Sequence, residues 1–312
     1  MSKTILVTGC GGDIGIAIGR ILKESFPTYR IAGADMTMDG PGHFVFDSVN
    51  ELPPADDARY FSELKDLADR ISLDLIIPMS EPELREFFRK RVTDAFEHIP
   101  VVMANPKTFE FSFDKLKTSQ LLDNLGLPYP WTRLVEEDPV SYPCIVKNRG
   151  LMGKGGVELA DRESVSHFRR TRPNDLWQEY LKGDEYTCGL YGTRSGEIRT
   201  IIFKRQLSNG TSGFTSAGVV VANREIEELL EALGAGMNLR GSCNIQLRLT
   251  ERGPMIFEIN PRFSSTVMFR HKLGFKDVIW SCSEAFGGSA DEYIPPRTGI
   301  RFYKGYTEYI ED

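Results

Sequence analysis

The first hundred residues alternate between short apolar runs and longer segments whose apolar positions recur with a helical period. Residues 5–7 form a β-branched run, and residues 14–22 follow it as an amphipathic segment. The same pattern predicts further strands at 30–35, 73–78 and 100–103 and further helices at 61–70 and 82–96. Strands that alternate with helices in this way form parallel sheets with helices on both faces. We therefore predict a doubly wound α/β domain.

The pattern changes after Asn105-Pro106. A helix is expected over residues 114–125, because Gly126 and two prolines follow its last apolar position. The remainder is rich in strands, predicted at 143–148, 156–160, 176–181, 185–191, 197–203, 218–222, 243–250 and 255–260, with helices at 164–170 and 225–234. This order favours an α+β region with mainly antiparallel sheets. A domain boundary is expected near residue 104.

Composition narrows the class of protein. The chain has 312 residues, 41% of them hydrophobic, and a formal net charge of −6, which suits a globular protein of two or three domains and gives no basic footprint for nucleic acid. No apolar run approaches the ~20 residues of a membrane helix, and no cleavable signal pattern is visible. Five scattered cysteines, none in a CxxC pair, indicate neither a disulfide framework nor a zinc site. We expect a cytoplasmic protein without nucleic-acid or membrane partners.

The first candidate site is the glycine-rich loop between residues 9 and 15, which joins the first strand to the first helix. Its amides and the helix N-terminus suit an anion, and Asp35 lies where a dinucleotide enzyme places its ribose-binding acid. An NAD-dependent oxidoreductase or epimerase is therefore one interpretation, although no tyrosine is followed by lysine four positions later. The others are a substrate-anion site and a tight turn that merely requires glycine.

The second candidate site is a loop of four glycines and two cations that follows the strand ending at Lys147. A flexible, cationic hairpin of this kind can fold over a polyphosphate, because it offers backbone amides and lysine charge together. The spacing is not that of a Walker A loop. A solvated β-turn is the alternative.

The third candidate site is the hairpin of strands 243–250 and 255–260. If the turn centres on Arg252, strand alternation places Gln246 opposite Glu258 and Asn244 opposite Asn260 on one face. Oxygen ligands with a single formal charge suit magnesium that already carries phosphate oxygens. Arg262 follows at once and could neutralise charge during phosphoryl transfer. The alternative is a polar, solvent-facing side of the hairpin.

In this order, the motifs resemble those of the ATP-grasp superfamily, specifically the carbamoyl-phosphate-synthase-like carboxylate–amine ligases. The resemblance covers nearly the whole chain and rests on Val7-Thr-Gly-Cys-Gly-Gly, Asp114-Lys115, Val146-Lys147 with its glycine loop, residues 178–186 and Phe257-Glu-Ile-Asn-Pro-Arg262. It implies a Rossmann-like pre-ATP-grasp domain at 1–104, a small lid subdomain at 105–180 and a large subdomain with the magnesium site at 181–312.

The resemblance also implies a nucleotide site for ATP. Its residues would be Lys115, Lys147, Gly150, Gly153, Lys154, Gly155, Gly156, Glu179, Tyr180, Leu181 and Glu185. In relatives the two lysines hold phosphates and the glycine loop forms a lid over them. The segment 179–181 corresponds to the hinge that binds adenine, and Glu185 to the acid that binds ribose.

The resemblance assigns the remaining chemistry to the hairpin. Gln246, Glu258 and Asn260 match magnesium ligands, for two ions or for Mn²⁺ in their place. Arg262 matches the arginine that supports γ-phosphoryl transfer, Lys147 is a second catalytic candidate, and Arg205 is a looser match. Many relatives have an acid at position 246, and we interpret glutamine there as a subtype.

The implied activity is ATP-dependent formation of an amide or peptide-like bond through an acylphosphate, with release of ADP and phosphate. The partners would be a small carboxylate and a small amine, neither of which the sequence identifies, and a homodimer is one candidate assembly. Two alternatives stay open: the nicotinamide enzyme named above, and a regulatory module that binds nucleotide without turnover.

Overall fold

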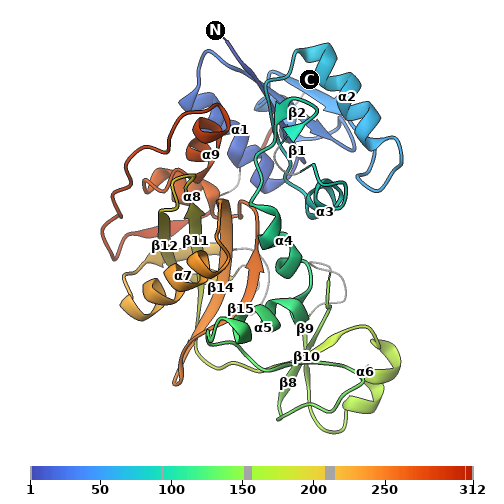
Figure 1. Ribbon diagram of the computed structural model, residues 1–312, viewed down its shortest axis with the longest axis vertical. Helices are drawn as coiled ribbons and strands as arrows, with labels where there is room; N and C mark the ends of the chain where they lie inside the picture. The colour runs from blue at the N-terminus through green and yellow to red at the C-terminus, as the bar shows by residue number, and fades with distance from the viewer. Residues whose placement is uncertain (1, 93–94, 151–156, 208–214, 306, 311–312) are drawn as a thin grey trace.

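The computed structural model describes residues 2–92, 95–150, 157–207, 215–305 and 307–310. Figure 1 shows three parts: an N-terminal α/β unit at the top, a large sheet in the middle and a small sheet at the bottom right. No helix in these residues is long and apolar enough to cross a membrane. All five cysteines are buried and unpaired.

The N-terminal unit is the predicted parallel sheet. Its strands run in the order β3-β2-β1-β4, with β1 at Thr4–Thr8, β2 at Arg30–Asp35, β3 at Ser48–Glu51 and β4 at Leu75–Ile77. Three helices, α1 (Asp13–Ser25), α2 (Tyr60–Ile71) and α3 (Glu81–Arg89), and a 3₁₀ turn (Pro41–Phe44) complete it. Ile5 and Val7 pack towards α1, whereas Leu6 packs towards α2. Both faces of the sheet are therefore covered, as the period of the pattern predicts.

One predicted helix is too long. The helix expected over 82–96 ends at Arg89, and Arg91 has a φ of 58°, which a continuing helix does not allow. The apolar Phe96 belongs instead to a short hairpin of β5 (Ala95–Phe96) and β6 (Ile99–Pro100). The strand expected at 100–103 is reduced to β6 and one parallel bridge from Val101 to Ile76.

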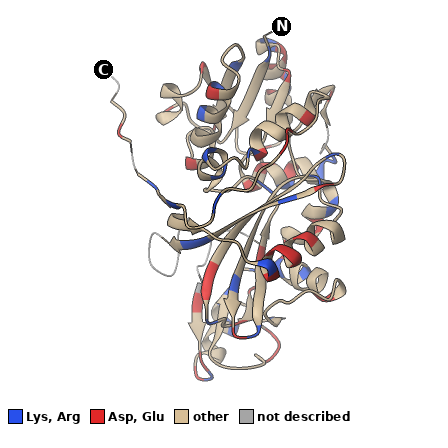
Figure 2. Ribbon diagram, turned by 90° about the vertical axis from the view of Figure 1, so that its left-hand side faces the viewer, with Lys and Arg blue, Asp and Glu red and all other residues tan. Residues whose placement is uncertain are grey.

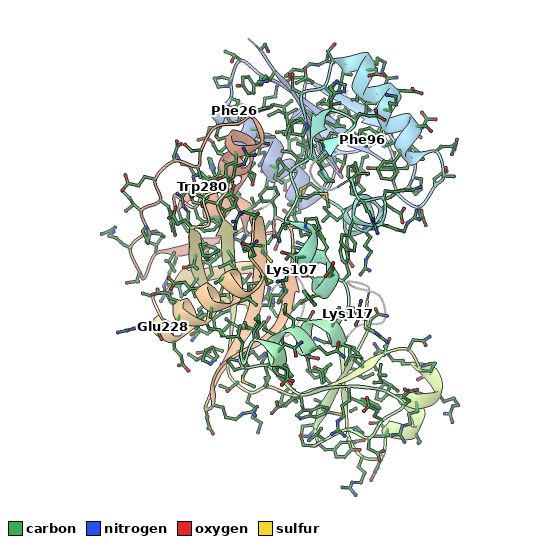
Figure 3. All side chains as sticks on the ribbon, in the orientation of Figure 1. Phe26, Phe96, Lys107, Lys117, Glu228 and Trp280 are labelled. Carbon is green, nitrogen blue, oxygen red and sulfur yellow. The ribbon has the colours of Figure 1, made fainter. Side chains whose placement is uncertain are left out.

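A six-stranded antiparallel sheet forms the middle of the molecule. Its order is β15-β14-β11-β12-β13-β16, with bounds β11 Asp184–Gly192, β12 Ile198–Leu207, β13 Thr215–Val220, β14 Gly241–Thr250, β15 Gly253–Asn260 and β16 Arg301–Tyr303. One face is covered by α4 (Pro106–Ser112), α5 (Lys115–Asn124) and α7 (Arg224–Gly236). Figure 3 shows Glu228 of α7 pointing away from the sheet, so the acidic segment of this helix is a solvated face.

Two helices that the sequence pattern did not predict join the large sheet to the N-terminal unit. They are α8 (Val267–Lys272) and α9 (Asp277–Ala285), and Val267 and Val278 belong to the same core as Ile5 and α1. The opposite side of α9 presents Trp280 to the second face of the large sheet. The end of β15, just before α8, is therefore fixed close to the N-terminal unit.

The small sheet has the order β7-β10-β8-β9 and one helix. Its strands are β7 (Thr132–Leu134), β8 (Cys144–Lys147), β9 (Val157–Ala160) and β10 (Leu176–Glu179), and its helix is α6 (Val165–Thr171). Trp177 fills its core together with Phe168 of α6. The domain boundaries expected at 104 and 180 stay predictions.

Candidate active site

A cleft lies where the N-terminal unit, the α4–α5 pair and the edge strand β15 meet. It encloses about 400 Å³ of space, part of it open to solvent. Its lining is Glu81, Leu84, Ser112, Phe113, Lys115, Thr118, Gly150, Glu258, Ile259, Asn260, Pro261 and Arg262. The structure thus brings together five of the residues assigned to ATP, magnesium and catalysis, from three segments of the chain.

The hairpin register is the one expected from the sequence. Gln246 pairs with Glu258 and Asn244 with Asn260, with a bulge only after Gln246. Glu258 and Asn260 line the cleft, whereas the other two side chains have protein partners. The Asn244 Oδ1 accepts from Thr187 at 2.9 Å and also from Arg270, and the Gln246 Oε1 accepts from Arg205 at 2.9 Å.

The donor set at this edge fits a magnesium ion that shares phosphate oxygens. The Asn260 side chain is buried, and its amide nitrogen has no hydrogen-bond partner among the described residues. Because the two ends of an amide exchange by a half turn, the same side chain can present its oxygen to a cation. Glu258 supplies the charge. No three His, Cys, Asp or Glu side chains in the described chain form a closed metal cage, so phosphate would complete the coordination.

Two lysines from different elements meet beside this edge. Lys147 ends β8, is only 6% exposed, and donates to the Phe257 carbonyl over 3.4 Å. Burial lowers the pKa of Lys147 to about 8, with Glu258 opposing and the nearby Lys115 reinforcing the shift. A buried ammonium without a carboxylate in contact is stabilised by an anion. The pair therefore suits phosphate, as expected for ATP.

Lys115 is held in place by the start of α5. Asp114 caps the helix by accepting from the Leu116 amide at 3.0 Å, and it forms a two-pronged ion pair with Arg149. The Lys115 amide donates to the Arg149 carbonyl at 3.0 Å. These contacts tie α5 to the segment after β8, so the cap that starts the helix also fixes the two lysines relative to each other.

Arg262 lines the cleft just after the end of β15. Its Nη1 donates to the Phe263 carbonyl at 2.8 Å. Burial lowers the pKa of this guanidinium, and the charges of Glu258 and Glu81 counteract the shift. An arginine stays protonated even so. A fixed cation is thus available beside the carboxylate that would hold magnesium.

Arg205 and Glu185 form a second polar group on the same face of the large sheet. Arg205 bridges Glu185 and Gln246, and Glu185 also accepts from Arg248 at 2.7 Å. Glu185, the expected ribose acid, is therefore held by two arginines.

The hinge expected at residues 179–181 joins the small sheet to β11. The Glu179 carboxylate pairs with Arg252 at the hairpin turn. Tyr180 has an exposed ring, with 40% of its surface accessible, whereas the Leu181 side chain is buried in the core. Their role in binding adenine stays a prediction.

The glycine loop after β8 is described only at its beginning. The Gly150 amide donates to the Asn148 side chain at 3.0 Å, and its carbonyl accepts from Arg85 of α3. Gly153, Lys154, Gly155 and Gly156 lie outside the described residues. Arg85 was not predicted. The sequence does contain a signal for it: Arg85 lies four residues after Glu81, so the two side chains share one face of the helix.

The first glycine loop is explained by its own packing. The Asp35 carboxylate accepts from the Gly11 amide at 2.9 Å and from the Met36 amide at 2.8 Å, so both of its oxygens serve the turn. A Cβ on Gly15 would lie 2.3 Å from the Gly9 carbonyl oxygen. Burial raises the pKa of Cys10 to about 12, which makes it a poor nucleophile. These contacts support the tight-turn interpretation.

Comparison with known proteins agrees with this geometry. A family model described as an ATP-grasp domain matches residues 112–266. The large chain of carbamoyl phosphate synthase from Mycobacterium sp. (strain JLS) is 24% identical over 216 residues, which is 62% of this chain and 19% of that protein. The chain therefore spans about a fifth of the curated relatives' length.

Solved structures share the fold over nearly the whole chain. N5-carboxyaminoimidazole ribonucleotide synthetase, in a complex with ADP, has a TM-score of 0.76 at 17% identity and covers 95% of this chain and 80% of its own. The L-amino acid ligase from Bacillus licheniformis has a TM-score of 0.72 at 17% identity and covers 91% and 74%. The family model thus identifies an ATP-grasp domain at residues 112–266, and these solved structures share the fold of the chain.

Proposed function

We propose that this chain is an ATP-dependent carboxylate–amine ligase that works through an acylphosphate. The observation that carries the proposal is the cleft in which Lys115, Glu258, Asn260 and Arg262 meet, with the buried Lys147 beside them. Two cations, a carboxylate, an amide and a guanidinium match a triphosphate with magnesium. The names of the structural relatives, a synthetase and an amino-acid ligase, support the same reaction class.

The proposed reaction has two steps. A substrate carboxylate oxygen attacks the γ-phosphorus, the bond to ADP breaks, and an acylphosphate forms. An amine nitrogen then attacks the acyl carbon, the bond to phosphate breaks, and an amide forms with loss of a proton from nitrogen. Because phosphoryl transfer needs charge neutralisation more than proton transfer, positioning and fixed charges would supply most of the catalysis.

Each residue has a part in this scheme. Lys115 and Lys147 would hold phosphates of ATP, and Arg262 would balance the charge that moves onto the transferred group. Gln246, Glu258 and Asn260 would hold magnesium, which supplies further charge neutralisation when bound. Arg205, now paired with Glu185 and Gln246, would exchange partners when ATP enters. The glycine loop would cover the acylphosphate and exclude water.

Thermal unfolding with Mg-ADP or NAD is the first test. A ligand at a hundred times its Kd adds about 2.7 kcal/mol of stability, so we expect the melting temperature to rise by about 5 °C with Mg-ADP. NAD should leave it unchanged. A rise with NAD alone would contradict the proposal and restore the nicotinamide interpretation.

Hydroxylamine trapping then tests the intermediate. The protein is incubated with Mg-ATP, hydroxylamine and a panel of small carboxylic acids, and hydroxamate and ADP are measured together. An acylphosphate predicts equal amounts of the two for at least one acid. Binding of Mg-ADP without ADP formation from any acid would indicate a regulatory module instead of a ligase.

A further inference from the structure

One wall of the cleft presents a carboxylate that the proposed ATP and magnesium contacts do not use. Glu81 is the first residue of α3, and its Oε1 accepts from Arg85 at 2.9 Å and 2.6 Å. Its Oε2 is buried and has no hydrogen-bond partner among the described residues. Arg85 thus fixes one oxygen of this cleft-lining residue, and the other oxygen is buried without a donor.

A buried carboxylate oxygen without a donor is costly, so its partner is expected from a molecule in the cleft. A phosphate or a substrate carboxylate would be repelled by Glu81 and attracted by Lys115 and Arg262. An amine, by contrast, brings N–H donors and, when protonated, a positive charge. Charge therefore separates the two substrates within the cleft. The acid is expected beside Arg262 and the amine beside Glu81.

A smaller chamber adjoins the cleft. About 240 Å³ of space, part of it open to solvent, lies here, and it shares Leu84, Pro261 and Arg262 with the cleft. Its other lining residues are Pro78, Val102, Met103, Ala104, Ser242 and Phe263. Apart from Ser242 and Arg262 this lining is apolar, so it gives no site for a second charge.

We propose that Glu81 binds the amine substrate of this ligase, and that the substrate is a primary amine whose carbon next to the nitrogen faces the apolar lining of the adjoining space. The inference rests on the proposed function and deepens it. Arg85 is the positioning residue, because it holds Glu81 Oε1 and also donates to the carbonyls of Phe113 at 3.0 Å and of Gly150. The amine site is thus coupled to the first residue of the glycine loop.

The test compares Glu81→Gln with Glu86→Gln. The first variant keeps an oxygen for Arg85 and replaces the buried Oε2 by an N–H donor, which repels an amine. The second removes the same charge from the same helix, where Glu86 pairs with Arg89 at 2.5 Å outside the cleft. Protein loaded with Mg-ADP is titrated calorimetrically with L-leucinamide, a cationic amine with a compact apolar group, and with its N-acetyl derivative.

We expect leucinamide to bind the wild type and Glu86→Gln within twofold of each other and Glu81→Gln at least tenfold more weakly. The N-acetyl derivative should bind none of them. Equal leucinamide binding by both variants, or no binding by the wild type, would overturn the amine site. Failure of Mg-ADP to bind would instead overturn the proposed function, so the two failures are distinguishable.

Turnover gives a second measurement with the acid found by hydroxylamine trapping. In Glu81→Gln the KM for the amine should rise at least tenfold, while the KM for ATP stays within twofold. If Glu81 only balanced the charge of Arg262, kcat and the KM for ATP would change and the KM for the amine would not. That result would assign Glu81 to the phosphate side and refute the inference.

Discussion

At the scale of single residues, Lys147 links the pH of the solution to nucleotide binding. Burial holds its pKa at about 8 in the nucleotide-free chain, and phosphate binds the protonated form. Mg-ADP affinity should therefore be flat below pH 8 and fall above it, by up to about tenfold per pH unit. Isothermal titration between pH 7 and 9.5 measures this. Lys147→Met should bind Mg-ADP weakly at every pH, and its affinity should not fall above pH 8. The same fall in that variant would mean that another group titrates.

The same lysine lowers the stability of the nucleotide-free protein. Its pKa is about 8 when folded and 10.5 in an ordinary environment, so the unfolded chain holds more protons between these values. The stability contribution of Lys147 should rise with pH across that window. Below pH 8 the buried charge costs about 3 kcal/mol. We expect Lys147→Met to unfold at higher denaturant concentration than the wild type at pH 7, and the difference to shrink towards pH 10.

Arg262 should matter for turnover more than for binding. Its charge lines the cleft beside Glu258, where the transferred phosphoryl group would develop charge. Arg262→Ala should lower kcat by about 100-fold or more, with the Mg-ADP affinity changed by only a fewfold. Arg262→Lys keeps the charge without the planar fork and should recover part of the rate. Retained turnover in the alanine variant would refute the assigned role.

At the scale of elements, the turn into α1 requires glycine for steric reasons. A Cβ at Gly15 would meet the backbone oxygen of Gly9 at 2.3 Å, whereas one at Gly12 would lie 3.4 Å from the same atom. Gly15→Ala should lower the free energy of unfolding by about 2–3 kcal/mol, and Gly12→Ala by less than about 1 kcal/mol. Chemical denaturation compares the two. Equal effects would mean that the turn serves more than packing.

The elements also show what a sequence can predict. The pairing of Gln246 with Glu258 follows from a period of two and a short turn, both local properties, and the structure has this register. The contacts of Arg205 and Arg248 with Glu185 were not predicted, because β12 and β14 flank β11 only through the order of strands in the sheet. The end of α3 was missed because the apolar Phe96 continues the pattern after the helix has stopped.

At the scale of the whole molecule, the cleft exists because distant segments are joined. Figure 2 shows acidic and basic residues over all parts of the ribbon, so charge alone does not mark the site. The site is marked instead by the places where separate parts of the chain meet. The helices α8 and α9, which follow β15, pack against α1, and α3 reaches the α4–α5 pair through Arg85. Such junctions depend on packing between units, which the local pattern does not encode.

We expect the contribution of Arg85 to stability to be measurable, because it joins α3 to the α4–α5 pair. Its guanidinium holds Glu81 of its own helix, the Phe113 carbonyl and the Gly150 carbonyl, and it lies over the Phe113 ring at 4.3 Å. Arg85→Ala removes these contacts and leaves the Glu81 carboxylate without its fixed donor, which should cost about 1–3 kcal/mol of stability. Arg89→Ala on the same helix, where the side chain is exposed, should cost less than about 0.5 kcal/mol.

The kinetic constants of Arg85→Ala distinguish a structural role of Arg85 from a functional one. If Arg85 aligns Glu81 with the glycine loop, Arg85→Ala should raise the KM for the amine by about tenfold and lower kcat, even at temperatures where the variant is fully folded. The affinity for Mg-ADP should change little, because Lys115 and Lys147 are held by α5 and β8. A variant that loses stability but keeps both kinetic constants would show that Arg85 only joins the two units, and that the amine site forms without it.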